Sequence, residues 1–404
     1  MGVGDGHSGW SQPQERGFEI PIETHAELAG ETDSSRERAA DQTPGSAPEE
    51  RATPGSSARA ESAVIRATLA PYAKPHLGRA LLGLLTSVGA YLAVSVGMYF
   101  ALRVSVLLEL ALAIPAAAFL VRTFIVFHDC SHGSYLAGRR ANAWLGMATG
   151  LLLFSPFLRW RHDHAVHHAT SGDLERRGVG DILTLTVSEY AALTPRQRRA
   201  YRLQRNAFVM FVIGPIVAMI IGPRIVAKGA RPRMRRAVIA TNVALAVFVG
   251  ALCFLIGWQD YLLIAGPPAL LAGSVGIWLF YVQHQFEDAY WETGSDWTYV
   301  DAALRGSSFL KLPKVLQFCT GSIGYHHVHH LSARIPNYNL QRAHEDNPMF
   351  HDVPTLSLRD GLRAVSLKLW DEDRGRLVSF AEARRRDDDR DRSTVQARPG
   401  VEAS

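Results

Sequence analysis

The sequence predicts an all-α, multi-pass membrane protein in which four transmembrane helices form two hairpins beneath a cytoplasmic helical cap with a histidine-rich site. Three observations lead to this fold. Four apolar stretches are each long enough to cross roughly 30 Å of hydrocarbon as a helix. Short connections join these stretches in pairs, and 12 of the 16 histidines fall between residues 128 and 344, beside the stretch ends.

Composition divides the 404 residues into three parts. Residues 1–62 are poor in aliphatic side chains and rich in Ser, Gly, Pro and Glu, so we expect a disordered tail without a secretory signal. Residues 63–370 form the predicted membrane domain with its cap. Residues 371–404 include the run EARRRDDDRDRSTVQARPG, which is typical of a solvated, disordered tail.

Cysteine and charge content exclude some classes of protein. Three isolated cysteines cannot form a disulfide framework, which fits a reducing compartment. The net charge is only +5, and no basic and aromatic residues alternate as in RNA-binding modules, so nucleic acid is not an expected partner.

The apolar stretches are predicted to be membrane spans that pair as hairpins. The first two are joined near Arg103 and the last two by the short sequence WQD. The four predicted spans are 78–100, 104–127, 237–257 and 261–283.

Two shorter apolar stretches, 141–157 and 208–223, are interrupted by Gly and Pro and are interpreted as re-entrant or interfacial. Strongly basic segments, 192–207 and 224–236, flank the second one, and basic loops favour the cytoplasmic side. This places both termini and all histidine clusters in the cytoplasm. If 208–223 instead formed a fifth span, either the early or the late histidines would lie outside.

Two charged residues fall inside predicted spans. Glu109 lies near the outer end of its span and is expected to snorkel to the interface. Arg122 lies deeper, and is either a paired or functional residue or a second snorkelling side chain.

Histidine spacing is the strongest local signal. The motif HDCSH places two histidines four residues apart directly after the second span, and HAVHH and HHVHH each place three at i, i+3 and i+4. Such spacing projects side chains from one face of a helix. His162 and His327 fall off these faces and are not expected to be ligands, whereas His284 directly follows the fourth span.

Nine histidines can therefore converge on one side of the membrane. A single zinc ion takes about four ligands, whereas two metal ions of coordination five or six would use all nine. Imidazole suits iron, copper, nickel and zinc alike, so the donors do not select the metal. A metal-storage tract would be of low complexity, unlike these motifs. The candidate ligands are His128, His132, His164, His167, His168, His284, His326, His329 and His330.

The three motifs and their flanks, WRHDHAVHHATSGDLERRGVGDI, HQFEDAYWE and GYHHVHHLSARIPNYNL, resemble those of integral-membrane fatty acid desaturases, in particular the delta-12/omega-6 acyl-lipid branch. The resemblance covers roughly residues 65–365. It implies that the nine histidines hold two Fe ions, that O2 is the co-substrate, and that a cis double bond is introduced into a long acyl chain, as in oleoyl to linoleoyl.

The resemblance also implies partners. The acyl chain would be carried as a membrane lipid, an acyl-CoA or an acyl carrier protein. Because no HPGG haem motif is present, a separate electron donor such as ferredoxin or cytochrome b5 is expected.

Carboxylates near the motifs are candidates to accept the second N–H of ligand imidazoles. They are Asp129, Asp163, Asp173, Asp181, Glu287 and Asp288. Arg159 and Arg161, beside Trp160, are expected either to touch lipid phosphates or an acyl carrier or to anchor the interface.

Other functions stay open at this stage. A fatty acyl hydroxylase, an acetylenase or a carotenoid oxygenase can use the same di-iron scaffold. A membrane metal-binding or transport protein is the non-enzymatic alternative, but it should carry polar residues along its spans, and these spans are almost purely aliphatic.

Overall fold

The computed structural model describes residues 63–386. The predicted tail at 1–62 and the last part of the predicted tail at 371–404 lie outside the described residues. The described chain is mostly helical, as expected, and it also contains five short strands.

Four helices are long and apolar enough to cross a membrane. The first, Leu77–Ala101, consists of α2 (Leu77–Leu84), the π-helical segment η1 (Leu85–Gly89) and α3 (Ala90–Ala101). The others are α4 (Val106–His132), α9 (Pro232–Ile256) and α10 (Trp258–His284). Their number and approximate position agree with the sequence prediction.

Two bent helix pairs occupy the ambiguous stretches. Helices α5 (Arg139–Leu152) and α6 (Phe157–Thr170) meet at 103°. Helix α8 (Pro195–Gln204) and the segment Val209–Arg224, which comprises η2 (Val209–Ile213), η3 (Ile216–Ile221) and η4 (Gly222–Arg224), meet at 58°. Length and composition alone allow each pair to be one broken span or a re-entrant loop, for a total of four to six spans.

The connections after α3 and after α9 meet in space. Arg103 in the first connection and Asp260 near the start of α10 form an ion pair, with a nitrogen–oxygen distance of 2.6 Å. The α9–α10 connection is a single residue, Gly257, whose φ of 87° lies in the region that favours glycine.

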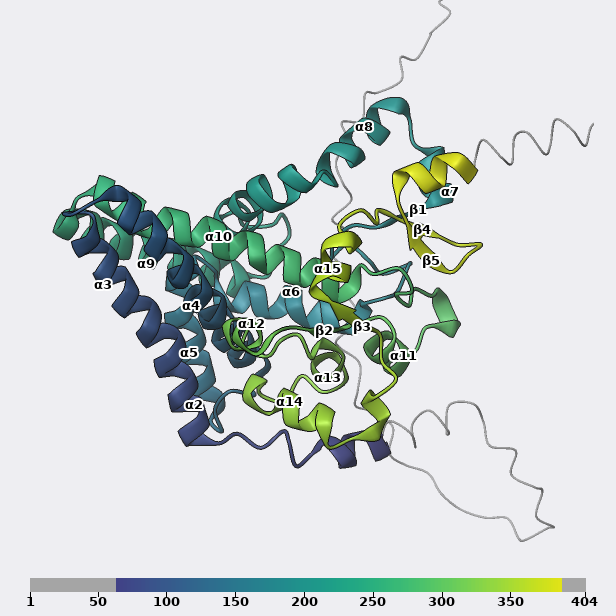
Figure 1. Ribbon diagram of the computed structural model, residues 1–404, viewed down its shortest axis with the longest axis horizontal. Helices are drawn as coiled ribbons and strands as arrows, with labels where there is room; N and C mark the ends of the chain where they lie inside the picture. The colour runs from purple at the N-terminus through teal and green to yellow at the C-terminus, as the bar shows by residue number, and fades with distance from the viewer. Residues whose placement is uncertain (1–62, 387–404) are drawn as a thin grey trace, which may run out of the picture. The chain divides into compact units, whose positions relative to one another are not determined.

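The remaining elements form the cap, in which α13 carries the third histidine motif (Figure 1). They are α7 (Val187–Ala192), η5 (Gly294–Asp296), α11 (Tyr299–Leu304), α12 (Lys314–Cys319), α13 (His326–Leu331), α14 (Asn337–Glu345), η6 (Pro348–Phe350) and α15 (Leu358–Ala364).

Two small sheets were not predicted. Strand β4 (Leu369–Asp371) pairs parallel with β1 (Leu185–Thr186) and antiparallel with β5 (Arg376–Val378), and β2 (Phe309–Lys311) pairs parallel with β3 (Thr355–Ser357). Strands this short do not show an alternating apolar pattern, which is why periodicity does not reveal them.

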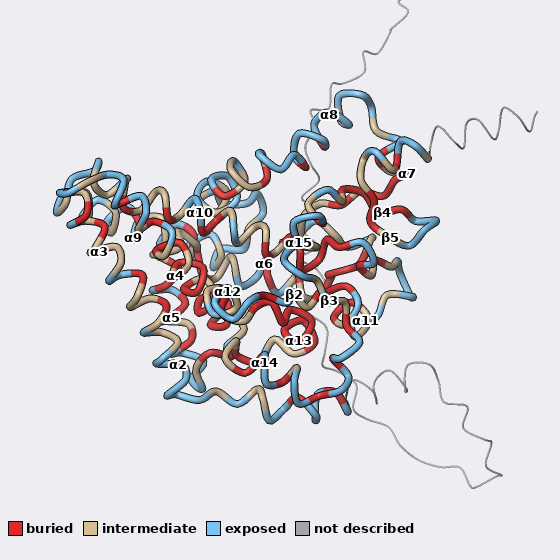
Figure 2. Tube along the Cα trace, viewed as in Figure 1, coloured by how far each residue is buried: buried red, intermediate tan, exposed pale blue. Residues whose placement is uncertain are grey.

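The structured chain extends past the expected boundary at residue 370. Strand β5 and a helical turn at 380–386 follow it, and Leu377, Val378 and Ala383 are at most 5 % exposed. Figure 2 shows buried chain along β4 and through α13. The charged residues around these few apolar residues made the segment look like a solvated tail. In the structure the apolar residues pack against distant elements such as α7.

Helix α4 contributes many residues to the main hydrophobic core. Glu109 differs from the snorkelling expectation, whereas Arg122 fits the alternative of a paired residue. Glu109 is 0 % exposed, and neither carboxyl oxygen has a hydrogen-bond partner within the described chain. Arg122 is buried; its guanidinium donates to the carbonyl of Phe318 and to Thr86 Oγ1, and lies 3.8 Å from the centre of the Phe318 ring. Arg122 therefore joins α12 to the membrane helices.

Candidate metal centre

The first histidine motif lies on a helix that continues beyond the apolar stretch. Helix α4 runs to His132, and Gly133 ends it with a left-handed φ of 70°. His128 and His132 are therefore one turn apart on the same face, with ring centres 4.9 Å from each other. This confirms the predicted helical placement.

The second motif lies on α6, whose position depends on close packing against α5. Phe157, at the start of α6, packs so tightly on Gly146 that a Cβ there would be 2.2 Å from the ring. Further along α6, Trp160 stacks on His164 with ring centres 4.3 Å apart, and its other neighbours are Phe124 and Phe127. This aromatic packing orients the histidine face of α6.

The third motif occupies the short helix α13, in which every residue is buried. His284 is the last residue of α10, so it enters the same region from the membrane side. Its Nε2 lies 3.0 Å from the Nε2 of His326.

The nine predicted histidines form two groups, and no other residues of the described chain enter them. We call them the five-histidine group, which is His128, His132, His164, His168 and His329, and the four-histidine group, which is His167, His284, His326 and His330. Within each group the potential ligand atoms all lie within 4.8 Å of one another. The sequence did not indicate how the motifs would be shared: HAVHH and HHVHH each contribute to both groups.

Nitrogen atoms within the five-histidine group already face one another. The Nε2 of His168 lies 3.2 Å from that of His164 and 2.9 Å from that of His329. Two facing nitrogens of neutral imidazoles can share at most one proton. Each nitrogen that carries no proton keeps a lone pair that a metal ion in the group could accept.

Two of the candidate carboxylates hold ligand imidazoles. Asp129 contacts His128 Nδ1 at 2.9 Å and accepts a hydrogen bond from the backbone N–H of Asn337 at 2.7 Å. Asp181 contacts Nδ1 of His167. A carboxylate on Nδ1 fixes the tautomer in which Nε2 is free to bind metal.

The other candidate carboxylates make different contacts. Asp163 pairs with Arg159 at 3.5 Å, Asp173 with Arg176 at 2.5 Å, and Glu287 with Arg376. Asp288 is exposed. Instead of a carboxylate, His284 Nδ1 has the carbonyl of Gly306 at 3.2 Å and Ser171 Oγ at 3.4 Å.

Burial favours the neutral form of the three α13 histidines in these groups before any metal binds. In α13, desolvation holds the pKa of His326, His329 and His330 well below the ordinary histidine value, and the neighbouring imidazoles lower the pKa further. Neutral imidazole is the form that binds metal.

Several buried ring nitrogens have no hydrogen-bond partner within the described chain. They include Nε2 of His132, His167 and His330. A buried polar atom without a partner is costly, and a metal ion in each group would satisfy these lone pairs. The residues therefore fit two metal ions, with more open coordination at the four-histidine group than at the five-histidine group.

The two histidines excluded by spacing lie outside both groups. His162 is exposed. His327 is buried, but its Nε2 faces His344 Nδ1 at 3.0 Å, among the rings of Phe309 and Phe350.

Sequence reasoning missed some residues of the site. Phe280 lies one helical turn before His284, and its ring centre is 5.0 Å from that of His167 and 5.5 Å from that of His284. The i−4 spacing could have indicated this contact. Gly306 contacts His284 and Asn337 contacts Asp129, and both partners are distant in sequence. No local sequence pattern indicates these two contacts.

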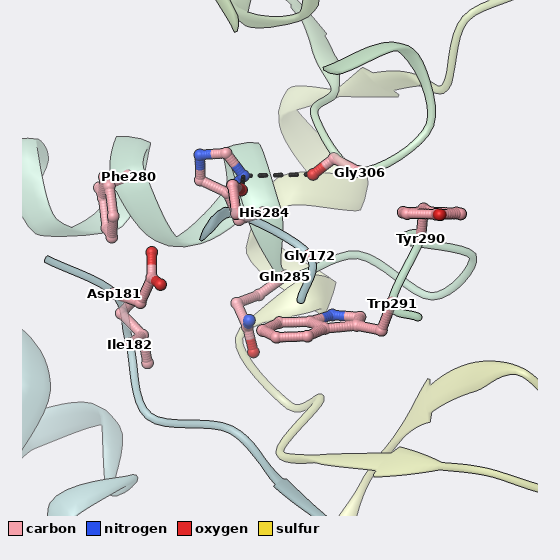
Figure 3. A pocket seen from close by; sticks show the side chains of 10 residues that line it. Gly172, Asp181, Ile182, Phe280, His284, Gln285, Tyr290, Trp291 and Gly306 are labelled. Atoms are coloured by element: carbon pink, nitrogen blue, oxygen red, sulfur yellow. Dashed lines mark hydrogen bonds between the residues drawn. The ribbon is translucent and has the colours of Figure 1, made fainter. Parts of the chain in front are cut away.

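A small cavity lies beside the four-histidine group. Figure 3 shows a cavity that Asp181, Phe280, His284 and Trp291 help to line. Its volume is about 10 Å³, which is space for about one water molecule.

Two all-histidine groups beside the ends of the apolar helices α4 and α10 define a membrane protein that can hold two metal ions. Comparison with known proteins adds the family. The model described as "Fatty acid desaturase" matches residues 75–356, and the chain belongs to that family.

Three relatives illustrate the range of similarity. A Bacillus subtilis (strain 168) protein named "Fatty acid desaturase" is 49 % identical over 312 residues, covering 77 % of this chain and 89 % of the relative. Two Synechocystis proteins are more distant. One is named "sn-1 acyl-lipid omega-3 desaturase (ferredoxin)", with 29 % identity over 55 % of this chain and 62 % of the relative. The other is named "sn-1 oleoyl-lipid 12-desaturase", with 27 % identity over 56 % and 64 %.

Proposed function

We propose that the chain is an oxygen-dependent fatty acyl desaturase in which the nine histidines hold two iron ions. The observation that carries the proposal is the sharing of nine buried imidazoles between two adjacent groups in a chain of the desaturase family. The net reaction converts –CH2–CH2– to a cis –CH=CH–, with O2, two electrons and two protons giving two molecules of water.

When bound, iron supplies the activation of O2 that the removal of hydrogen from an unactivated methylene requires. The protein holds and orients the ligands. Asp129 and Asp181 fix the orientation of two imidazoles, and the rings of Trp160 and Phe280 cover the site from two sides. These residues are positioning residues, because they act through the ligands.

For the position of the double bond, we propose delta-12, the oleoyl to linoleoyl conversion. The sequence around the histidine motifs and the relative named for an oleoyl-lipid 12-desaturase support it. A relative named for the omega-3 position is similarly close, so the assay must resolve position. We also propose an acyl-lipid substrate and a ferredoxin-type electron donor, because relatives named for the omega-3 position are also named for acyl-lipid and ferredoxin.

For membrane orientation, we propose two hairpins with both termini and the metal centre on the cytoplasmic side. The ion pair between Arg103 and Asp260 supports a common location for the two hairpin turns. The basic segments at 192–207 and 224–236 support the cytoplasmic side for the termini and the metal centre.

The test is expression in a host with a simple lipid profile, followed by mass spectrometry that locates double bonds. The matched control is a variant with His167→Ala and His329→Ala. A new cis double bond that the control lacks supports desaturation, and its position tests delta-12. Hydroxylated or acetylenic products would indicate another reaction of this scaffold. Unchanged lipids, despite two bound iron ions and a working electron donor, would overturn the proposal.

A further inference from the structure

A cavity of about 390 Å³ reaches the metal centre beside His132. Its lining includes Cys130, Asn142 and three arginines, Arg139, Arg161 and Arg334, and no carboxylate. His132 and His168 are the partly exposed members of the nine, whereas the other seven are at most 9 % exposed. The cavity is therefore a direct approach from solvent to a ligand imidazole.

The first arginine is held by an ordered loop. Arg139 begins α5, a few residues after His132. The amide of Asn142 donates to the carbonyls of Leu136 and Gly138 at 2.6 and 3.0 Å, and its oxygen accepts the N–H of Leu136 at 3.0 Å. These bonds set where the backbone of Arg139 lies.

The other two arginines come from the other ligand-bearing elements. Arg161 lies on α6, between Trp160 and His164, which stack on each other. Arg334 lies three residues after the end of α13 and precedes Ile335, which is 0 % exposed. Each of the three histidine motifs thus has an arginine beside it, and these arginines converge on one opening.

The three guanidinium groups are not neutralised. All three side chains are exposed, and within residues 63–386 none of them pairs with a carboxylate. The nearby Arg159 differs, because it pairs with Asp163. A cavity lined by one sign of charge concentrates the electric field and attracts a partner of opposite sign.

We propose that this arginine rim is the docking surface for an acidic one-electron carrier protein, and that electrons enter the centre at His132. The inference rests on the proposed desaturase function. Each turnover needs two electrons, so two reduced carriers dock in succession and leave oxidised. His132 belongs to the five-histidine group, and its ring lies 4.9 Å from those of His128 and His329 and 4.8 Å from that of His168.

Because the arginine rim lies beside the ligands, a lipid phosphate fits it less well than an electron carrier does. A headgroup held by these arginines would put the glycerol beside the ligands, whereas the methylene groups to be oxidised lie many carbon atoms along the acyl chain. An electron carrier, in contrast, benefits from the shortest path between its redox centre and a ligand. Complementary charge at such a rim mainly speeds association and makes it sensitive to salt.

The test compares two reductants on iron-loaded protein in phospholipid nanodiscs. One is a reduced, acidic [2Fe–2S] ferredoxin, and the other is dithionite, which needs no docking. The variant carries Arg139→Glu, Arg161→Glu and Arg334→Glu, and the control carries Arg199→Glu, an exposed arginine on α8. We expect the ratio of ferredoxin-driven to dithionite-driven rates to fall about tenfold or more in the triple variant, mainly through KM for ferredoxin.

The control should keep the wild-type ratio, and the wild-type ferredoxin-driven rate should fall as salt is raised. A triple Arg→Gln variant, which keeps bulk and removes charge, should show a smaller fall. An unchanged ratio in both triple variants overturns the proposal. A second result also overturns the proposal. If the triple variants lose desaturation rate equally with both reductants, and lose more as the phospholipid substrate is diluted, the rim binds the lipid headgroup.

Failure of the proposed function is a separate result, namely no desaturation by the wild type with either reductant. Ferredoxin binding measured directly still tests the docking surface in that case. The docking surface is supported if ferredoxin binds the wild type in a salt-sensitive way and does not bind the triple variants. It is contradicted if ferredoxin binds the wild type and all variants equally.

Discussion

The Nε2 atoms of His329 and His168 lie 2.9 Å apart although 161 residues separate them in the sequence. Both belong to the five-histidine group, whereas His330 and His167, their immediate neighbours, belong to the four-histidine group. Adjacent histidines on each helix therefore serve different groups, and the two groups are joined by the backbone of α6 and α13.

Removal of one histidine should have a group-specific effect on metal content. His284→Ala leaves three imidazoles in its group and should lower iron from two toward one per protein, with at least a hundredfold loss of activity, because a metal group with a missing ligand binds weakly. Elemental analysis of purified protein measures this. His162→Ala, at an exposed position outside both groups, is the matched control and should keep two iron ions, as should His327→Gln. Loss of iron in the His327 variant with the fold intact would show that the ligand assignment is wrong.

Asp181→Asn should weaken metal binding by about 10- to 100-fold, because Asp181 holds Nδ1 of His167. Chelator competition on the folded protein measures the change in affinity. Asp163→Asn is the control, since Asp163 pairs with Arg159 and touches no ligand ring. Equal effects of the two substitutions would remove the proposed role of Asp181.

Gly146→Ala should destabilise the protein and disturb the metal centre together. The new methyl group would overlap Phe157, which packs on Phe127 with ring centres 5.6 Å apart, and Phe127 packs on Trp160 at 5.0 Å. Overpacking of this kind costs about 1–3 kcal/mol. Thermal unfolding and iron content are the measurements.

Gly97→Ala is the matched control for that substitution, because Gly97 lies in α3 with open space around its Cα. Alanine is favoured over glycine in a helix by about 1 kcal/mol, so this variant should keep or raise the melting temperature. A Gly146 variant as stable as the Gly97 variant would contradict the packing argument.

Lys368→Met should stabilise the protein at neutral pH. Burial lowers the pKa of Lys368 from 10.5 to about 8, and its Nζ has no hydrogen-bond partner within the described chain. Between pH 8 and 10.5 the unfolded state binds more protons than the folded state, so stability rises with pH in this window. The cost of the buried charge is therefore largest below pH 8.

We expect a gain of about 1 kcal/mol at pH 7, after allowance for solvent screening, and a smaller gain at pH 10. Melting temperatures at the two pH values test this, with Lys311→Met at an exposed position as control. A gain that does not depend on pH would mean that the methionine acts through packing and not through charge.

The sequence was sufficient for features that depend on local pattern. Apolar length predicted the four spans. Helical spacing selected eight histidines and set aside His327 and His162, and the position directly after the fourth span added His284. It was insufficient for features that depend on distant contacts. No local pattern distinguishes Asp181, which touches a ligand, from Asp288, which is exposed. The burial of Glu109 and the pairing of β1 with β4 likewise arise only when separate elements pack.

The division of HAVHH and HHVHH between the two groups also has a consequence for biosynthesis. Each group needs at least one histidine from α13, so a ribosome must have reached residue 329 before the five-histidine group is complete and residue 330 before the four-histidine group is complete. A nascent chain that carries only α4 and α6 offers an incomplete set of imidazoles. Metal binding by either group should thus follow synthesis of nearly the whole domain that carries them, and a chain that stops early cannot complete one group alone.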